Sequence, residues 1–294
     1  MWQSSWVKSE LEKLGCAVEL IQIKTQGDVQ TGSLAQIGGQ GLFTKQIQIA
    51  LLEDKIDLAV HSLKDLPTED IEGLKISAIP QRETTSDALC LPADAAAIDS
   101  PNQLPQNATI GTGSVRRAAQ LLHLRPDLNV KDIRGNVDTR LEKLDSGQYD
   151  AIILAAAGLT RLGLEKRISF TFDKTLMLPA VGQGALGLEI RGDDSATAEV
   201  VGKLSHRESY AAALAERTML RRLYAGCLAP VGALCETDGE TLKLTGVVLS
   251  RDGKTKVEAA ESSSLDEFQT LGVAVAEKLI NQGADKLLAE AKSS

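Results

Sequence analysis

The order of apolar patterns along the chain constrains its fold more than any other feature. Short apolar or alternating runs, typical of strands, are followed by longer runs with apolar residues three and four positions apart, typical of helices. One example comprises a glycine-rich loop at 38–41, a helical pattern from about 44 to 55, an apolar strand at 56–60 and a polar turn at 61–67. This alternation predicts an α/β fold.

The chain opens on a helical pattern rather than on a strand. The pattern covers residues 2–14 and stops at Gly15, a residue type that suits the position after a helix; residues 17–23 then alternate like a strand. Since α/β domains usually lead with a strand, we expect a further strand of about 5–10 residues to precede this helix in the complete fold.

Two changes of pattern indicate three domains. A stretch rich in Ala, Asp and Pro at 93–106 precedes a second series of strands and helices, and from residue 205 a long helix leads into strands with Asp-Gly turns at 238–239 and 252–253. A glycine-bounded strand at 179–190 is expected to return the chain to the first domain. The predicted domains are residues 1–84 with 181–204, residues 85–180, and a small α+β domain of residues 205–294.

Charge is distributed unevenly along the chain. The 294 residues include 32 Lys and Arg against 40 Asp and Glu, a net charge of −8, which argues against a general nucleic-acid binder. Residues 111–167 nevertheless carry a net charge of +3, which leaves −11 for the remainder. The middle domain therefore favours an anionic ligand.

Cysteine, histidine and apolar content exclude several other classes. The 4 cysteines are too scattered for a disulfide framework, and neither they nor the 3 histidines have metal-ligand spacing. No apolar run approaches the ~18 residues of a membrane span, and no secretory leader is seen. We expect a cytoplasmic protein without a metal site.

Two strand-to-helix loops carry the arginines of the middle domain. Residues 111–117 (GTGSVRR) follow a strand and open a helix, so backbone N–H groups and the helix dipole favour an anion there. Residues 133–140 repeat the arrangement. Because parallel strands end at one edge of a sheet, the arginines of both loops would converge and suit a ligand with several carboxylates. For the first loop alone, an ordinary turn with solvated arginines is an equal alternative.

The turn at 61–67 (HSLKDLP) offers a candidate acid and base. Asp65 lies between Lys64 and an apolar Leu-Pro pair. The alternative is a surface ion pair between Lys64 and Asp65, with Ser62 capping the turn. Lys64 could instead form a Schiff base. His61 alone is more typical of a packed, hydrogen-bonded histidine.

Cys227 differs from the other cysteines. It follows the long helix in a loop, close to Arg221 and Arg222, where a thiol could serve as a nucleophile or an attachment point. The other three cysteines lie in apolar patterns typical of small buried side chains.

Five segments, in this order and spacing, resemble the porphobilinogen deaminase family over essentially the whole chain. They are residues 61–67 (HSLKDLP), 111–117 (GTGSVRR), 134–140 (RGNVDTR), 181–186 (VGQGAL) and 226–227 (GC). The resemblance implies an α/β fold with two domains like those of periplasmic binding proteins, a cleft between them, and a small α+β third domain.

The resemblance also implies the activity of a transferase, hydroxymethylbilane synthase. Four porphobilinogen molecules would be condensed stepwise, with loss of ammonia, onto a dipyrromethane cofactor held by a thioether to Cys227, and water would then release the linear tetrapyrrole. Asp65 matches the family's catalytic aspartate, which accepts pyrrole N–H hydrogen bonds, stabilises positive charge and transfers protons. Lys64 would then bind a carboxylate rather than form an imine.

Further residues match the family's cofactor- and substrate-binding positions. Porphobilinogen carries an acetate and a propionate, which gives the arginine-rich loops a ligand. The matching residues are Ser62, Lys64, Thr112, Ser114, Arg116, Arg117, Arg134, Gly135, Asn136, Arg140, Arg161 and the aromatic Phe43. No metal, nucleic acid or membrane is implied as a partner, and we expect a monomer.

The sequence departs from the family pattern in two places. Family members begin with a strand that contains an Arg and a Ser, of which only Trp2 and Gln3 remain, and Gln40 and Gln46 stand where Lys and Glu are common. Two alternatives to an active enzyme therefore remain: an N-terminally truncated inactive form, and an anion-binding solute-binding protein with a two-domain cleft.

Overall fold

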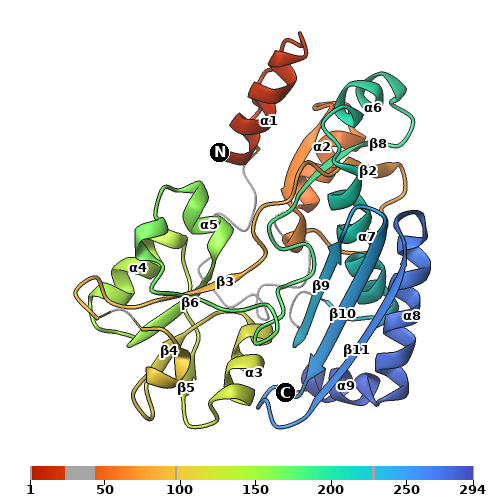
Figure 1. Cartoon of the computed structure of the whole chain (residues 1–294). Coiled ribbons are helices and arrows are strands. Elements are labelled where there is room, and N and C mark those ends of the chain that lie inside the picture. Colours follow the sequence, from red (N-terminus) through yellow and green to blue (C-terminus); the bar gives the residue numbers. More distant parts are fainter. Residues whose placement is uncertain (1, 24–43, 97, 227–228, 294) are drawn as a thin grey trace.

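The computed structural model describes residues 2–23, 44–96, 98–226 and 229–293. Within these ranges the strands form three separate sheets, each with its own helices (Figure 1). The α/β class predicted from the sequence is confirmed. The positions of the sheets agree with the three predicted domains, whose boundaries remain a prediction.

The first sheet is built from segments far apart in the chain. Its strands are β1 (Ala59–Ser62), β2 (Leu74–Ala78) and β8 (Leu186–Arg191), with β8 in the centre and antiparallel to both neighbours. Helices α1 (Trp2–Lys13), α2 (Lys45–Leu52) and α6 (Ser195–Gly202) accompany it. Because β8 pairs with β1 and β2, the chain returns to its first sheet after the middle one, as expected.

The middle sheet has the order β5-β4-β6-β3-β7. Strands β4 (Thr109–Gly111), β5 (Asn129–Lys131) and β6 (Ala151–Ala155) run parallel, while β3 (Asp87–Cys90) is antiparallel to β6 and to β7 (Phe170–Thr171). Successive residues of β6 enter two different hydrophobic clusters, so apolar side chains cover both faces of the sheet. Its helices are α3 (Val115–Leu124), α4 (Val137–Asp145) and α5 (Ala156–Arg161).

The third sheet is antiparallel and continuous in sequence. Strands β9 (Val231–Thr237), β10 (Thr241–Leu249) and β11 (Lys256–Ser264) form two successive hairpins with turns at the predicted Asp-Gly pairs. Helices α7 (Arg207–Arg222), α8 (Phe268–Asn281) and α9 (Ala284–Ser293) pack on it around one large apolar cluster. Short 3-10 turns complete the fold at Leu63–Asp65, Pro101–Gln103, Glu165–Arg167 and Leu265–Glu267.

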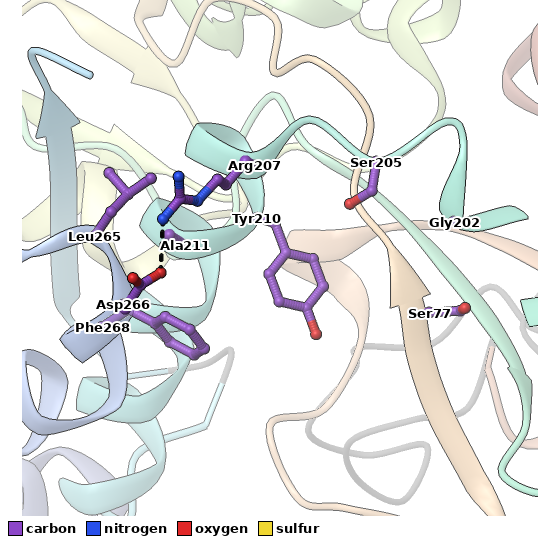
Figure 2. A pocket seen from close by; sticks show the side chains of 9 residues that line it. All are labelled: Ser77, Gly202, Ser205, Arg207, Tyr210, Ala211, Leu265, Asp266 and Phe268. Atoms are coloured by element: carbon purple, nitrogen blue, oxygen red, sulfur yellow. Dashed lines mark hydrogen bonds and ion pairs between the residues drawn. The ribbon is translucent and has the colours of Figure 1, made fainter. Parts of the chain in front are cut away.

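Helix α7 also borders the first sheet. Between them lies a pocket of about 380 Å³, where Tyr210 of α7 projects towards Ser77 of β2 (Figure 2). At its rim Arg207 pairs with Asp266 at 2.8 Å, and Phe268 packs edge-on to Tyr210 with ring centroids 6.2 Å apart. The third sheet and its helices are thus connected to the first sheet through α7.

The strand predicted at 17–23 is wrong. These residues form no ladder with any described strand, and Leu20 and Ile21 are 40% and 54% exposed. A groove of about 940 Å³ separates them from β1, which is the edge of its sheet. Because a strand exists only through hydrogen bonds to a neighbour, an alternating pattern beside an unfilled position stays irregular. None of the helices within the described ranges is both long and apolar enough to cross a bilayer.

Other predicted boundaries shift by a few residues. Strand β1 begins at Ala59 instead of 56 and includes His61, and β8 begins only at Leu186, after a series of turns from 179. Strands β2, β3 and β7 and helices α6 and α9 were missed. Their segments are short and lack a clear period.

Candidate active site

Asp65 lies at the carboxyl end of β1, on the surface of the protein. The 3-10 turn Leu63–Asp65 ends the strand, and its flanking side chains Leu63 and Leu66 are 1% and 3% exposed, whereas Asp65 is exposed. The apolar residues hold the turn in the core, so the carboxylate projects from a fixed backbone.

The VGQG segment forms the support under this turn. A Cβ on Gly182 would lie 3.1 Å from Leu63 Cγ, and one on Gly187 would lie 2.8 Å from Leu63 Cδ1. Gly182 also has φ +71°, a backbone conformation that glycine adopts without strain. The glycines therefore let Leu63 pack closely on the neighbouring backbone. This packing fixes the position of the turn that carries Asp65.

Two other polar residues of the 61–67 turn have defined partners. His61 is buried, with Nε2 2.9 Å from Glu189 Oε2, which confirms the packed histidine. Ser62 Oγ accepts a hydrogen bond from Gln3 Nε2 at 2.7 Å and does not cap the turn. The N-terminal end of α1 therefore lies against the end of β1.

The three arginine-bearing loops follow three neighbouring parallel strands. In the register of the middle sheet, Gly111 of β4 lies between Lys131 of β5 and Ile152 of β6. The loops that follow these strands therefore leave the same edge, as predicted for the first two of them. They contain all the predicted binding residues of this unit: Thr112, Ser114, Arg116 and Arg117 after β4, Arg134, Gly135, Asn136 and Arg140 after β5, and Arg161 on α5 after β6.

The small polar residues of the first two loops form hydrogen bonds with the backbone of the same loops and helices. Ser114 caps α3, with Oγ accepting from Arg117 N at 3.4 Å, and Asn136 caps α4, with Oδ1 accepting from Thr139 N at 2.9 Å. Thr112 is buried, and its backbone N–H donates to Lys131 O at 3.0 Å, which ties the first loop to the second.

Arg116 and Arg117 point inward to a carboxylate that the sequence analysis missed. Both guanidinium groups contact Asp87 of β3, whose side chain is fully buried; Arg117 Nε donates to Oδ1 at 2.9 Å. Gln183 of the VGQG segment donates to the same oxygen at 2.9 Å and to Thr85 O at 2.6 Å. Although burial opposes ionisation, the two arginines hold the pKa of Asp87 well below its usual range.

This buried cluster keeps a net positive charge. One carboxylate faces two guanidinium groups, and Arg116 Nε is a buried donor without a hydrogen-bond partner. The arginines predicted to bind the ligand directly are thus partly engaged inside the protein. No sequence signal marked Asp87, while Gln183 lay within a segment that had been singled out for its glycines.

The remaining arginines are crowded or only partly satisfied. Burial lowers the pKa of Arg140, and the like charges of Arg117 and Arg134 lower it further. Arg161 donates to Gly184 O at 3.1 Å and lies over the Trp2 ring at 5.7 Å, while its buried Nε lacks a partner. Like charges held together in this way favour an anion between them.

Lys64 brings the Asp65 turn within electrostatic reach of Arg116 and Arg117. Burial lowers the pKa of Lys64; the Asp65 charge opposes that shift, and the Arg117 charge adds to it. Leu63 packs on Gly182, and Arg161 donates to Gly184 O in the same segment, so the end of β1 and the arginine-bearing side of the middle unit adjoin one common region.

Two family models match the chain. Residues 1–199 match the model described as "Porphobilinogen deaminase, dipyromethane cofactor binding domain", and residues 210–281 match "Porphobilinogen deaminase, C-terminal domain". The chain belongs to the porphobilinogen deaminase family. The resemblance seen in its five motifs is thereby confirmed.

Curated members of the family are similar over nearly the full chain. The porphobilinogen deaminases of Geobacter metallireducens and Geobacter sulfurreducens are each 47% identical over 293 residues, which cover 99% of this chain and 91% of the relative. Among solved structures, the VFT2 domain of BvgS from Bordetella pertussis matches 69% of this chain and 76% of its own, at 15% identity and a TM-score of 0.43.

The described residues fit the cofactor of the porphobilinogen deaminase family. A dipyrromethane made from porphobilinogen carries acetate and propionate groups, and the site offers a surplus of cations with the unpartnered donors Arg116 Nε and Arg161 Nε. Bidentate pairing with carboxylates is what guanidinium groups do best. Across the described ranges, no three His, Cys, Asp or Glu side chains are grouped to hold a metal ion.

Two predicted site residues, Phe43 and Cys227, lie outside the described residues. The other cysteines do not compete for the role of attachment point. Cys90 and Cys235 are buried, and burial raises the pKa of the Cys90 thiol to about 11 and that of Cys235 further still. Cys16 is half-buried beside α1.

Proposed function

We propose that the protein is a hydroxymethylbilane synthase. It condenses four porphobilinogen molecules, with loss of ammonia at each step, onto a dipyrromethane bound through a thioether to Cys227, and then releases the linear tetrapyrrole by hydrolysis. Family membership supports this proposal. The observation that carries it is the juxtaposition of an exposed carboxylate, Asp65, with arginines of the middle unit: Leu63 of its turn packs on Gly182, and Arg117 and Arg161 donate to Gln183 and Gly184 of the same segment.

Asp65 is the proposed catalytic residue. Loss of ammonia from porphobilinogen generates positive charge on the pyrrole, which a nearby carboxylate stabilises, and the carbon that forms the new bond must then lose a proton. An exposed carboxylate on a fixed turn can accept a pyrrole N–H hydrogen bond and take up that proton. One residue thus serves each of the repeated additions.

The cations are proposed to bind carboxylates of substrate and cofactor. Arg134, Arg140 and Arg161 offer guanidinium groups at the sheet edge, and Lys64 adds a cation from the first unit within electrostatic reach of Arg116 and Arg117. Arg116 and Arg117 act from a buried position, where they share Asp87 and retain a net positive charge.

Uncharged groups complete the proposed binding site. Ser62, Thr112, Ser114, Gly135 and Asn136 shape the loops around it, and Phe43 is assigned by family resemblance. When bound, the dipyrromethane would supply the free pyrrole carbon to which the first porphobilinogen is joined, and each later one would be joined to the terminal ring of the growing chain. The protein's own contribution is to hold the acidic side chains, place Asp65 beside the reacting ring and move the proton.

The finer predictions on partners and location belong to the same proposal. We propose a cytoplasmic monomer that acts on porphobilinogen and binds no nucleic acid. The net charge of −8 supports the last point, because a nucleic-acid-binding surface normally carries net positive charge.

Intact-protein mass spectrometry tests the proposal. The purified protein should carry an adduct of two pyrrole units that is lost in Cys227→Ala and kept in the matched control Cys16→Ala. Ammonia release from porphobilinogen should require the adduct. An unmodified protein that still binds porphobilinogen would instead indicate a solute-binding protein, and a loaded protein without turnover would indicate an inactive form.

Asp65→Ala tests the catalytic assignment separately. If the variant receives preassembled cofactor, it should keep the adduct but fail to extend it. Normal turnover in this variant would contradict the role given to Asp65.

A further inference from the structure

Helix α7 belongs to the third unit but packs against the turn that carries Asp65. Met219 lies in the core of the third unit, with the side chains of α8 and the antiparallel sheet. Ala213, on another face of the same helix, shares a hydrophobic cluster with Leu63 and Leu66. The helix is therefore in contact with both residues that hold Asp65 in place.

Arg217 adds a polar link at the same point. Its Nη1 donates to Leu66 O at 2.9 Å and its Nη2 donates to Pro67 O at 2.6 Å, and the residue is only 8% exposed. These carbonyls belong to the two residues directly after Asp65. Hydrogen bonds from a charged, buried guanidinium are stronger than neutral ones, and its planar fork holds both carbonyls at once.

The backbone before Asp65 is held from the opposite side. Leu63 N donates to Ala185 O at 3.0 Å, and the Leu63 side chain packs on Gly182 and Gly187. Within the described part of the chain, no hydrogen bond to the Asp65 carboxylate itself is found. Its position therefore depends on these two backbone attachments.

We infer that Arg217 is a positioning residue that sets the Asp65 carboxylate relative to the growing product; this inference rests on the function proposed above. Helix α7 ends at Arg222, five residues before Cys227. Helix α7, which precedes the proposed attachment point in sequence, thus also forms hydrogen bonds to the turn that carries the proposed catalytic acid. Arg217 joins these two parts of the reaction across a boundary between units.

Steady-state kinetics of the loaded enzyme test the inference. Arg217→Met keeps the aliphatic stem but loses the hydrogen bonds to Leu66 O and Pro67 O, and should lower kcat about 10- to 100-fold, since a displacement of ~1 Å at a catalytic group has an effect of that size. KM should stay within about two-fold and the two-pyrrole adduct should remain, because no substrate contact is removed. Arg217→Lys can donate to one carbonyl at a time and should recover part of kcat.

Arg221→Met is the matched control. Arg221 lies one turn further along α7 and pairs with Asp70 of the same connecting segment, but both side chains are exposed, at 44% and 84%. It should leave kcat unchanged. Wild-type kcat in Arg217→Met, or an equal loss in Arg221→Met, would overturn the inference. If Arg217→Met does not fold, wild-type kcat in Arg217→Lys would overturn it as well.

A double-variant cycle with Asp65→Glu separates this inference from the proposed function. If Arg217 acts through Asp65, Arg217→Met should reduce kcat less in the Asp65→Glu background than in the wild type. Fully independent effects would overturn the positioning role and leave the function of Asp65 intact. Wild-type kcat in Asp65→Glu and in Asp65→Asn would contradict the proposed function itself.

Discussion

Arg82 and Glu216 form a bidentate ion pair, with Nη1 to Oε1 at 2.8 Å and Nη2 to Oε2 at 2.9 Å, and the Glu216 side chain is fully buried. Arg82 lies between β2 and β3, where the chain leaves the first sheet, and Glu216 lies on α7. The same carboxylate accepts from the N–H groups of Gly182, on the returning segment, and Cys235 of β9. The Glu216 side chain thus binds both chain segments that run between the first and the middle sheet, and it also binds a strand of the third sheet.

Removal of Arg82 should therefore destabilise the whole protein. Arg82→Met leaves a buried carboxylate without its counter-ion, a change that costs about 3–5 kcal/mol in the free energy of unfolding. Urea unfolding measures this quantity. The control is Arg207→Met, which breaks the exposed pair with Asp266 and should cost far less, because solvent screens an exposed ion pair. Equal losses in the two variants would contradict the structural role given to the buried pair.

Asp87 should make stability depend on pH in the acid range. Its pKa in the folded protein lies below the ordinary value of 3.8, so its stabilising contribution is present above about pH 4 and is lost as the pH falls towards the folded-state pKa. Asp87→Asn should be less stable than the wild type by about 3–5 kcal/mol at neutral pH, and the difference should narrow below about pH 4.

Urea unfolding of both proteins between neutral pH and about pH 3 checks this expectation. Asp127→Asn is the control, because Arg125 lowers the Asp127 pKa to about 2 but the pair lies at the protein surface. The effect of Asp127→Asn on the free energy of unfolding should therefore be smaller and should weaken as salt is added. A constant difference between wild type and Asp87→Asn across the whole range would show that the Asp87 charge is not involved.

The sequence predicted the parts of the site that follow from local pattern. The ends of β4 and β5 could be placed because an apolar run, a glycine or capping residue and a helical period occur in order at each of them. Parallel pairing then brings Thr112 and Arg134 to one edge whatever the rest of the fold does, whereas Arg161 was assigned by the family resemblance.

The inward side of the site could not be predicted in the same way. Asp87 is 29 residues from Arg116 and 96 from Gln183 in sequence, and nothing local distinguishes an acid that faces two arginines from one that faces solvent. Arginines at the start of a helix can point to a ligand or into the protein, and tertiary packing decides which. Residues 17–23 show the same limit, because their pattern is that of a strand but they pair with no strand within the described residues.

The close approach of Gly182 to Leu63 should matter for catalysis. In Gly182→Ala the new Cβ would lie 3.1 Å from Leu63 Cγ and 3.2 Å from its carbonyl carbon, so the turn must move and Asp65 with it. We expect kcat to fall about 10-fold or more. Gly147→Ala is the control, because Gly147 also has a positive φ, +77°, but no atom within 4 Å of the added Cβ. It should cost about 1 kcal/mol of stability through backbone strain and leave kcat unchanged.

Arg140 should contribute to binding without stabilising the fold. Its guanidinium is half-buried beside Arg117 and Arg134, whose charges repel it, and its Nε bonds only to the backbone at Gly135 O, 2.8 Å away. Arg140→Met removes that repulsion together with one hydrogen bond, so the free energy of unfolding should change by less than about 1 kcal/mol.

The KM for porphobilinogen should respond differently. A charge-assisted hydrogen bond to a substrate carboxylate contributes about 1.5–3 kcal/mol, so its loss in Arg140→Met should raise KM about 10- to 100-fold with little change in kcat. Arg167→Met is the matched control in the same unit, because Arg167 already pairs with Asp145 at 2.7 Å and has no role in the site. An unchanged KM in Arg140→Met would show that Arg140 does not bind a substrate carboxylate. An equal rise of KM in Arg167→Met would show that the rise does not depend on the position of Arg140 beside Arg117 and Arg134.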